Sequence, residues 1–157
     1  MTFLLIILVS VIAILALLSW ALVLFTRHFL HNDLRKIAQT LLVLLILQFI
    51  LGMMSNLFQS VPSTQPWRVF HDFGPILFHT ANATLLLILG FVFLYHALRG
   101  HMHPVAARIG LASIILAYIC GVMFVNFGQI NLYSFGMALG FISAFTVYSY
   151  LAFAREK

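Results

Sequence analysis

Long runs without a charged side chain are the feature that most constrains the fold of this chain. The longest, Ile109 to Phe153, contains no Asp, Glu, Lys or Arg. A helix needs about 20 apolar residues to cross a bilayer, so this run is too long for one crossing. A dense polar cluster, Phe127 to Asn131, interrupts it. We therefore expect two transmembrane helices here, with Asn131 as the N-cap of the second.

The composition of the whole chain is typical of an integral membrane protein. Apolar residues make up 64% and charged residues 7% of the 157 residues, whereas soluble domains have roughly 45–50% and about 25%. The formal charge of +5 is spread in small groups between the apolar runs. This distribution indicates membrane topology and a lipid bilayer as partner, and it argues against a nucleic-acid partner.

The pattern predicts an all-α fold, a polytopic membrane helical bundle of five transmembrane helices in one domain covering residues 1–157. The expected spans are residues 3–26, 37–58, 73–98, 109–126 and 132–153. Asp33 and Asp72 are placed to cap the second and third spans. Pro75 falls in the first turn of the third span, where a missing backbone donor costs little.

The basic residues predict the orientation of these spans. Only Arg68 falls on one side of the five-span arrangement, and the other Lys and Arg residues fall on the opposite side: Arg27, Arg35, Lys36, Arg99, Arg108, Arg155 and Lys157. Cytoplasmic loops are enriched in Lys and Arg. We therefore expect the N-terminus outside and the C-terminus in the cytoplasm, in a bacterial inner membrane.

Polar side chains gather in the outer halves of the second and third spans. Together with one amide at the end of the fourth span, they predict an outward-facing ligand pocket lined by Gln48, Asn56, His79, Asn82 and Asn126. An ionisable residue within a span, such as His79, marks function by default. The alternative is that the amides and hydroxyls only hydrogen-bond between helices. The sequence leaves both open.

The histidines suggest cofactor binding at two levels. His96 ends the third span and His28 follows the end of the first, so both lie at a similar depth near the cytoplasmic side. Two imidazoles from different helices can be the axial ligands of a b-type haem iron. His79, with Asn82 nearby, predicts an outer site for a second haem or a quinone. The second iron ligand there would be His71 or a methionine.

Other histidines lie in the predicted loops. His31, His101 and His103 add candidate ligands for the cytoplasmic side, either for haem or, with His28 and Asp33, for zinc or another transition metal. The alternative is that these loop histidines are hydrated interfacial residues.

Small residues recur at four-residue spacing in the last span, at Gly136, Gly140 and Ala144. Such stripes let helix backbones approach closely in lipid, so we expect a packing surface here.

Two segments carry a resemblance to known proteins. They are Leu51 to Pro66 (LGMMSNLFQSVPSTQP) and Phe124 to Phe141 (FVNFGQINLYSFGMALGF), with a histidine in the span between them. The chain resembles a group of small multi-pass bacterial membrane proteins over its second to fifth spans, and this implies no particular activity. Its histidine-bearing helices are loosely similar to small membrane b-type cytochromes, which implies haem b. Those proteins place facing histidines on separate helices, whereas His79 and His96 share one span.

Three functions follow from these observations. The first is an electron-transfer protein that binds haem b or a quinone and works with a membrane redox partner. The second is a binding or transport protein, expected to be a homo-oligomer, with a small solute in the pocket around His79. The third is an accessory subunit of a larger membrane complex. Enzymatic activity stays open, but hydrolysis by paired carboxylates is disfavoured because the only acids are Asp33, Asp72 and Glu156.

Overall fold

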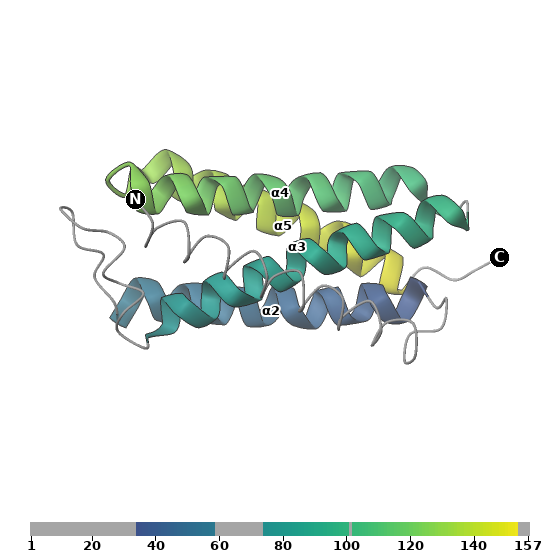
Figure 1. The fold of residues 1–157 in the computed structure, drawn as a ribbon, viewed down its shortest axis with the longest axis horizontal. Coiled ribbons are helices and arrows are strands. Elements are labelled where there is room, and N and C mark those ends of the chain that lie inside the picture. Colours follow the sequence, from purple (N-terminus) through teal and green to yellow (C-terminus); the bar gives the residue numbers. More distant parts are fainter. Residues whose placement is uncertain (1–33, 59–73, 101, 154–157) are drawn as a thin grey trace, which may run out of the picture. The chain divides into compact units, whose positions relative to one another are not determined.

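The computed structural model describes residues 34–58, 74–100 and 102–153. They form four α-helices: α2 (Leu34–Phe58), α3 (Pro75–Arg99), α4 (Pro104–Asn126) and α5 (Asn131–Phe153) (Figure 1). No strand occurs among these residues. Each helix has 23 or 25 residues and is apolar enough to cross a membrane. The described part therefore has the length and composition of a transmembrane helical bundle.

These helices correspond to four of the five predicted spans, and the first span, residues 3–26, lies outside the described residues. The largest difference is at α4, which begins at Pro104 and not at residue 109. Proline is well suited to the first turn of a helix because the backbone donor it lacks would have no helical partner there. Pro75 opens α3 in the same way, after Gly74 at the N-cap. The predicted caps Asp33 and Asp72 lie outside the described residues.

A short turn separates α4 from α5 at the predicted polar cluster. Gly128 and Gln129 adopt positive φ angles of 78° and 61°, a left-handed backbone that ends a helix. The amides of Phe127 and Gln129 donate to the carbonyls of Met123 and Phe124 in the last turn of α4. The prediction of two helices in the uncharged run is confirmed. Asn131, the predicted N-cap, is instead the first residue of α5.

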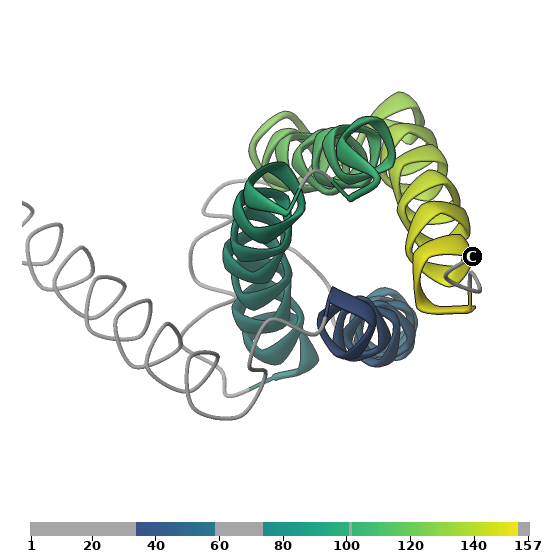
Figure 2. The same ribbon diagram turned by 90° about the vertical axis from the view of Figure 1, so that its right-hand side faces the viewer.

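The four helices form a ring in chain order. Each packs against its neighbours in sequence, and α5 closes the ring against α2 (Figure 2). Short connections between α3 and α4 and between α4 and α5 make those pairs antiparallel, as in other helical bundles.

Buried side chains concentrate at one end of this ring, which we call the packed end. It is where α2 and α4 begin and where α3 and α5 end. Its buried residues include Ile37, Leu41, Leu45, Leu89, Phe93, Ala97, Ala107, Leu111, Ala144, Tyr148 and Leu151. The opposite end, which we call the loose end, has few buried side chains, and Ile76 and Asn82 are the ones on α3. Hydropathy along the sequence does not predict this asymmetry.

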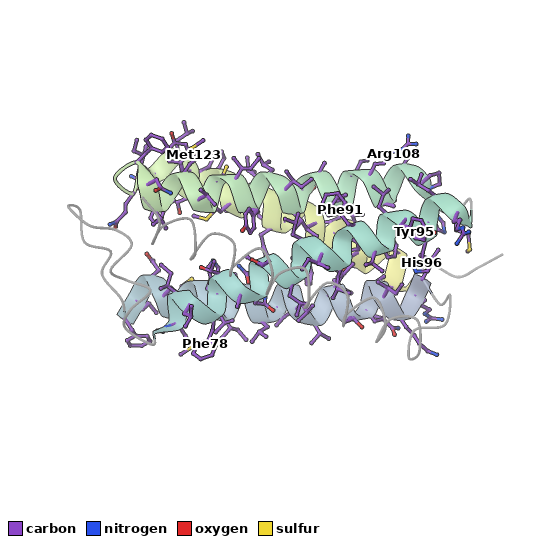
Figure 3. All side chains as sticks on the ribbon, in the orientation of Figure 1. Phe78, Phe91, Tyr95, His96, Arg108 and Met123 are labelled. Carbon is purple, nitrogen blue, oxygen red and sulfur yellow. The ribbon has the colours of Figure 1, made fainter. Side chains whose placement is uncertain are left out.

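The packed end also carries the described basic residues, Arg35, Lys36, Arg99 and Arg108. Arg108 lies at the same end as Tyr95 and His96, and Phe78 and Met123 lie toward the other (Figure 3). The Arg35 Nε donates to the backbone carbonyl of Ala152 at 2.9 Å. This bond satisfies one of the carbonyls that the last turn of a helix leaves free. It therefore fastens the start of α2 to the end of α5.

The small-residue stripe of α5 faces α4. A Cβ atom on Gly140 would lie 2.7 Å from the backbone oxygen of Ser113 and 2.9 Å from the backbone nitrogen of Ala117. Only glycine allows such a close approach of two backbones. Gly136 lies beside the Cys120 sulfur, and Ala144 is buried. The prediction that this stripe is a packing surface is confirmed.

Tyr148 of α5 fills the interior of the packed end. Its side chain is 0% exposed, and its ring packs edge-on against Phe93 with centroids 5.5 Å apart. A Cβ atom on Gly110 would lie 2.8 Å from the Tyr148 Cζ, so that glycine makes room for the ring. The Tyr148 hydroxyl is buried and has no hydrogen-bond partner among the described residues.

This unpaired hydroxyl predicts that Tyr148→Phe does not destabilise the bundle. A buried hydroxyl without a partner costs about 1–3 kcal/mol in protein mutational data, so its removal is expected to raise the free energy of unfolding by about 1 kcal/mol. Thermal unfolding in detergent, followed by circular dichroism, measures the change. Tyr150→Phe, at a tyrosine that is 59% exposed, is the matched control. A loss of stability in Tyr148→Phe greater than in the control would contradict the prediction.

Candidate functional site

Three polar side chains form a hydrogen-bonded group between α2 and α3, which we call the polar network: Gln48, His79 and Asn82. The Asn82 Nδ2 donates to the Gln48 Oε1 at 2.7 Å and to the backbone carbonyl of Leu44 at 3.0 Å. The Gln48 Nε2 lies 3.2 Å from the His79 Nε2. Leu44 and Gln48 are one turn apart on α2, as His79 and Asn82 are on α3, so each pair lies on one helix face.

The Leu44 carbonyl determines the direction of every hydrogen bond in this network. A carbonyl oxygen can only accept, so Asn82 must present its amide nitrogen to α2. That same nitrogen then meets the Gln48 side-chain oxygen, which turns the Gln48 amide nitrogen toward His79. Because an amide nitrogen only donates, the His79 Nε2 must accept. The network therefore holds a neutral imidazole whose proton is on Nδ1.

Gly52 provides the surface against which the His79 ring lies. A Cβ atom on Gly52 would be 3.0 Å from the ring Cε1 and 3.3 Å from Nδ1. Gly52 is one helical turn beyond Gln48 along α2, so the Nδ1 side of the ring lies nearer the loose end than Nε2 does. The Nδ1 atom is buried and has no hydrogen-bond partner among the described residues. Among the described residues, this donor thus has no acceptor in hydrogen-bonding geometry, although the ring also interacts with the Gln48 backbone.

The other amides of the predicted pocket do not bond to this network. Asn56 lies near the end of α2 and is exposed. The Asn126 Nδ2 donates to the carbonyl of Val122 in its own helix at 2.7 Å, and Asn126 is also exposed. The structure therefore connects Gln48, His79 and Asn82 directly and leaves the two remaining amides apart from them.

The hydroxyl side chains near the network bond within their own helices. The Oγ atoms of Ser55, Thr80 and Thr84 donate to carbonyls four residues earlier, at 2.8–3.0 Å. Such bonds satisfy a hydroxyl locally in a helix. The alternative of hydrogen bonds between helices therefore holds for the amides of Gln48 and Asn82, which bond between α2 and α3, and not for these three hydroxyls.

The candidate haem ligands are only partly described. His96 is half-buried at the packed end, with its ring edge-on to Tyr95 at a centroid distance of 5.5 Å. The Arg99 guanidinium lies 5.5 Å from the centre of the same Tyr95 ring. The other candidates near that end, His28, His31 and His101, lie outside the described residues, as does His71. The predicted iron pair of His28 and His96 therefore stays a prediction.

His103 occupies the N-cap of α4 with a left-handed backbone, φ 49°, and its ring lies 6.0 Å from that of Tyr150. Within the described ranges, no group of three or more His, Cys, Asp or Glu residues is close enough to hold a metal ion. The transition-metal site predicted from the loop histidines stays a prediction, since most of those histidines lie elsewhere in the chain.

His79 and His96 belong to separate ends of the bundle. They are about 25 Å apart along α3. A haem iron at His79 would have to replace the Gln48 amide at Nε2, because that atom accepts the hydrogen bond. The geometry at His79 is thus that of a fixed hydrogen-bond donor.

Comparison with known proteins adds no relative: no protein family matches the chain, and no curated protein or solved structure is significantly similar to it. The class of protein therefore rests on the fold and the site: a helical bundle of transmembrane length with a partly buried polar network between two helices. The resemblance to small bacterial membrane proteins stays a prediction.

Proposed function

We propose that this protein binds a small amphipathic molecule at the loose end of its bundle, through His79. The observation that carries the proposal is the buried His79 Nδ1, which has no hydrogen-bond acceptor among the described residues while the Gln48 side chain fixes the other ring nitrogen. A buried donor without a partner costs about 1–3 kcal/mol. A ligand that supplies the acceptor would remove this cost.

The depth of His79 supports an amphipathic ligand. His79 is one turn, about 6 Å, inside the start of α3. A molecule with its polar group at that depth would keep its apolar part among the helices or in the surrounding lipid. The loose end offers exposed apolar side chains for such contacts, including Phe49, Met53 and Phe78.

The proposal includes an orientation of the bundle in the membrane. We place the packed end at the cytoplasmic face, because Arg35, Lys36, Arg99 and Arg108 lie there and cytoplasmic ends are enriched in Lys and Arg. With residues 3–26 as a further crossing, the chain would span the membrane five times. The site at His79 would then lie in the outer leaflet.

Photolabelling tests the proposed function. The protein is reconstituted in lipid nanodiscs and irradiated with a photoreactive alkyl diazirine that carries a terminal hydroxyl, and labelled residues are mapped by mass spectrometry. We expect saturable labelling of α2 and α3 near Gly52 and His79, reduced at least about fivefold in His79→Phe. That substitution keeps an aromatic ring against Gly52 and removes the donor.

The matched control is Phe91→Leu, at a side chain of the same helix that is 53% exposed and about 18 Å from His79 along α3. It should label like the unchanged protein. Labelling that increases linearly with probe concentration, or that His79→Phe leaves unchanged, would contradict the proposed function.

Electron transfer with haem b, the first function predicted from the sequence, is the alternative to this proposal. The visible spectrum of protein purified from haem-replete cells tests it, and a Soret band that is lost in His96→Ala would favour it over the binding function.

A further inference from the structure

We infer that the molecule bound at His79 is neutral and presents a carbonyl oxygen to the Nδ1 proton. This inference rests on the proposed binding function and names the chemical class of the ligand. Quinones and esters with an apolar tail belong to that class.

The polarity of the network selects an acceptor. A series of hydrogen bonds runs from the Leu44 carbonyl through Asn82 and Gln48 to His79, and each has one possible direction. The remaining ring nitrogen, Nδ1, is therefore a donor. A ligand that offers only a donor would place two N–H or O–H groups against each other. To accept such a ligand, the imidazole would have to exchange its tautomer and lose the bond from Gln48. Acceptors are therefore favoured without any rearrangement of α2 or α3.

Within the described residues, the network offers a cation no negatively charged partner. The chain has three acidic residues, Asp33, Asp72 and Glu156, and none is among the described residues. Besides the Gln48 backbone, the polar groups beside the His79 ring are amide side chains, and the remaining ring nitrogen is a donor. Nothing in the described part of the site would compensate a positive charge that had left water, a transfer that is costly in lipid.

The position of the Nδ1 nitrogen argues for a ligand with an apolar tail. The Nδ1 side of the ring lies against Gly52, where α2 has no side chain, and toward the loose end. Because the ring packs closely on Gly52 and Nδ1 is buried, only a small acceptor such as a carbonyl oxygen would reach it, while the tail of the ligand would follow the apolar surface of α2 or α3. A strongly hydrated anion would have to lose its water beside these apolar side chains.

Two sources can supply such a carbonyl: a quinone headgroup, or the ester groups of the phospholipids themselves. Lipids whose chains are joined by ether bonds lack the ester carbonyl. The test therefore uses nanodiscs of ester-linked and of ether-linked phosphatidylcholine, with the diazirine alcohol described above as the reporter.

Decylubiquinone, decyltrimethylammonium and decane are compared as competitors of the reporter in both kinds of nanodisc. In ether-linked lipid we expect decylubiquinone to displace the label at about tenfold lower concentration than either of the others, since one hydrogen bond to a fixed donor accounts for about that factor. In His79→Phe the three should compete equally. If ester lipids occupy the site themselves, the label should be weaker in ester-linked than in ether-linked nanodiscs.

The carbonyl stretch of decylubiquinone, measured by infrared difference spectroscopy, is the second readout. It should shift to lower frequency in the unchanged protein and remain unshifted in His79→Phe. Equal competition by all three compounds, or an unshifted carbonyl stretch, would overturn the inference. If the label still saturated in that case, the proposed binding function would stand. A label that does not saturate would overturn the binding function first.

Discussion

Replacing Gly140 by leucine is expected to prevent α4 and α5 from packing together. The first atom of any side chain at this position would lie 2.7 Å from the Ser113 carbonyl oxygen and 2.9 Å from the Ala117 backbone nitrogen. Both are backbone atoms, so the two helices must separate. Overpacking in a core costs about 1–3 kcal/mol even where side chains can move, and we expect more than about 3 kcal/mol here.

Thermal unfolding in detergent, with far-ultraviolet circular dichroism and size-exclusion chromatography, measures this effect. Gly121→Ala is the control, because a Cβ atom at Gly121 would meet only the flexible Met137 sulfur, at 3.4 Å. Alanine in place of a helical glycine contributes about 0.5–1 kcal/mol of stability. A Gly140→Leu protein as stable as the control would show that α4 and α5 do not approach as closely as described.

Replacing Asn82 by leucine is expected to destabilise the contact between α2 and α3. Asn82 is 7% exposed and donates twice to α2. Hydrogen bonds between membrane helices average about 0.6 kcal/mol, whereas a buried group left unpaired costs about 1–3 kcal/mol. Leucine leaves the Gln48 oxygen unpaired, so the second effect should dominate, with a loss of about 1–2 kcal/mol.

Thr80→Val is the control for this substitution. It keeps the size of the side chain and removes one hydroxyl that bonds to the Ile76 carbonyl of the same helix, so a change within about 0.5 kcal/mol is expected. If Asn82→Leu unfolds at the same temperature as this control, the network contributes nothing to the packing of α2 on α3.

The helices could be predicted from the sequence because the length of an apolar run decides whether it can span a membrane. The break at Gly128 and Gln129 is predictable because the uncharged run is too long for one crossing and these residues lie in its polar cluster. The start of α4 was placed at Ile109 because Arg108 was assigned to a loop. In the structure Arg108 lies on the helix and is exposed at the packed end, as long basic side chains near helix ends commonly are.

The site was predictable in part. Gln48, His79 and Asn82 were expected together because they are polar and lie in the same halves of adjacent spans. Which face of each helix meets its neighbour depends on packing, and hydropathy does not contain that information. For the same reason, no sequence signal predicts the bond from Asn82 to the Leu44 carbonyl or the fit of Tyr148 against Gly110. The prediction also places Asn126 in the pocket, although Asn126 bonds to its own helix.

The protonated nitrogen of His79 tests the central claim most directly. Nitrogen-15 NMR of the protein with labelled histidine, assigned by comparison with His79→Phe, distinguishes the two neutral tautomers of the ring. We predict a proton on Nδ1 and an unprotonated Nε2 that accepts a hydrogen bond from Gln48. A proton on Nε2 would contradict the directions derived from the Leu44 carbonyl, and with them the donor that the proposed ligand site requires.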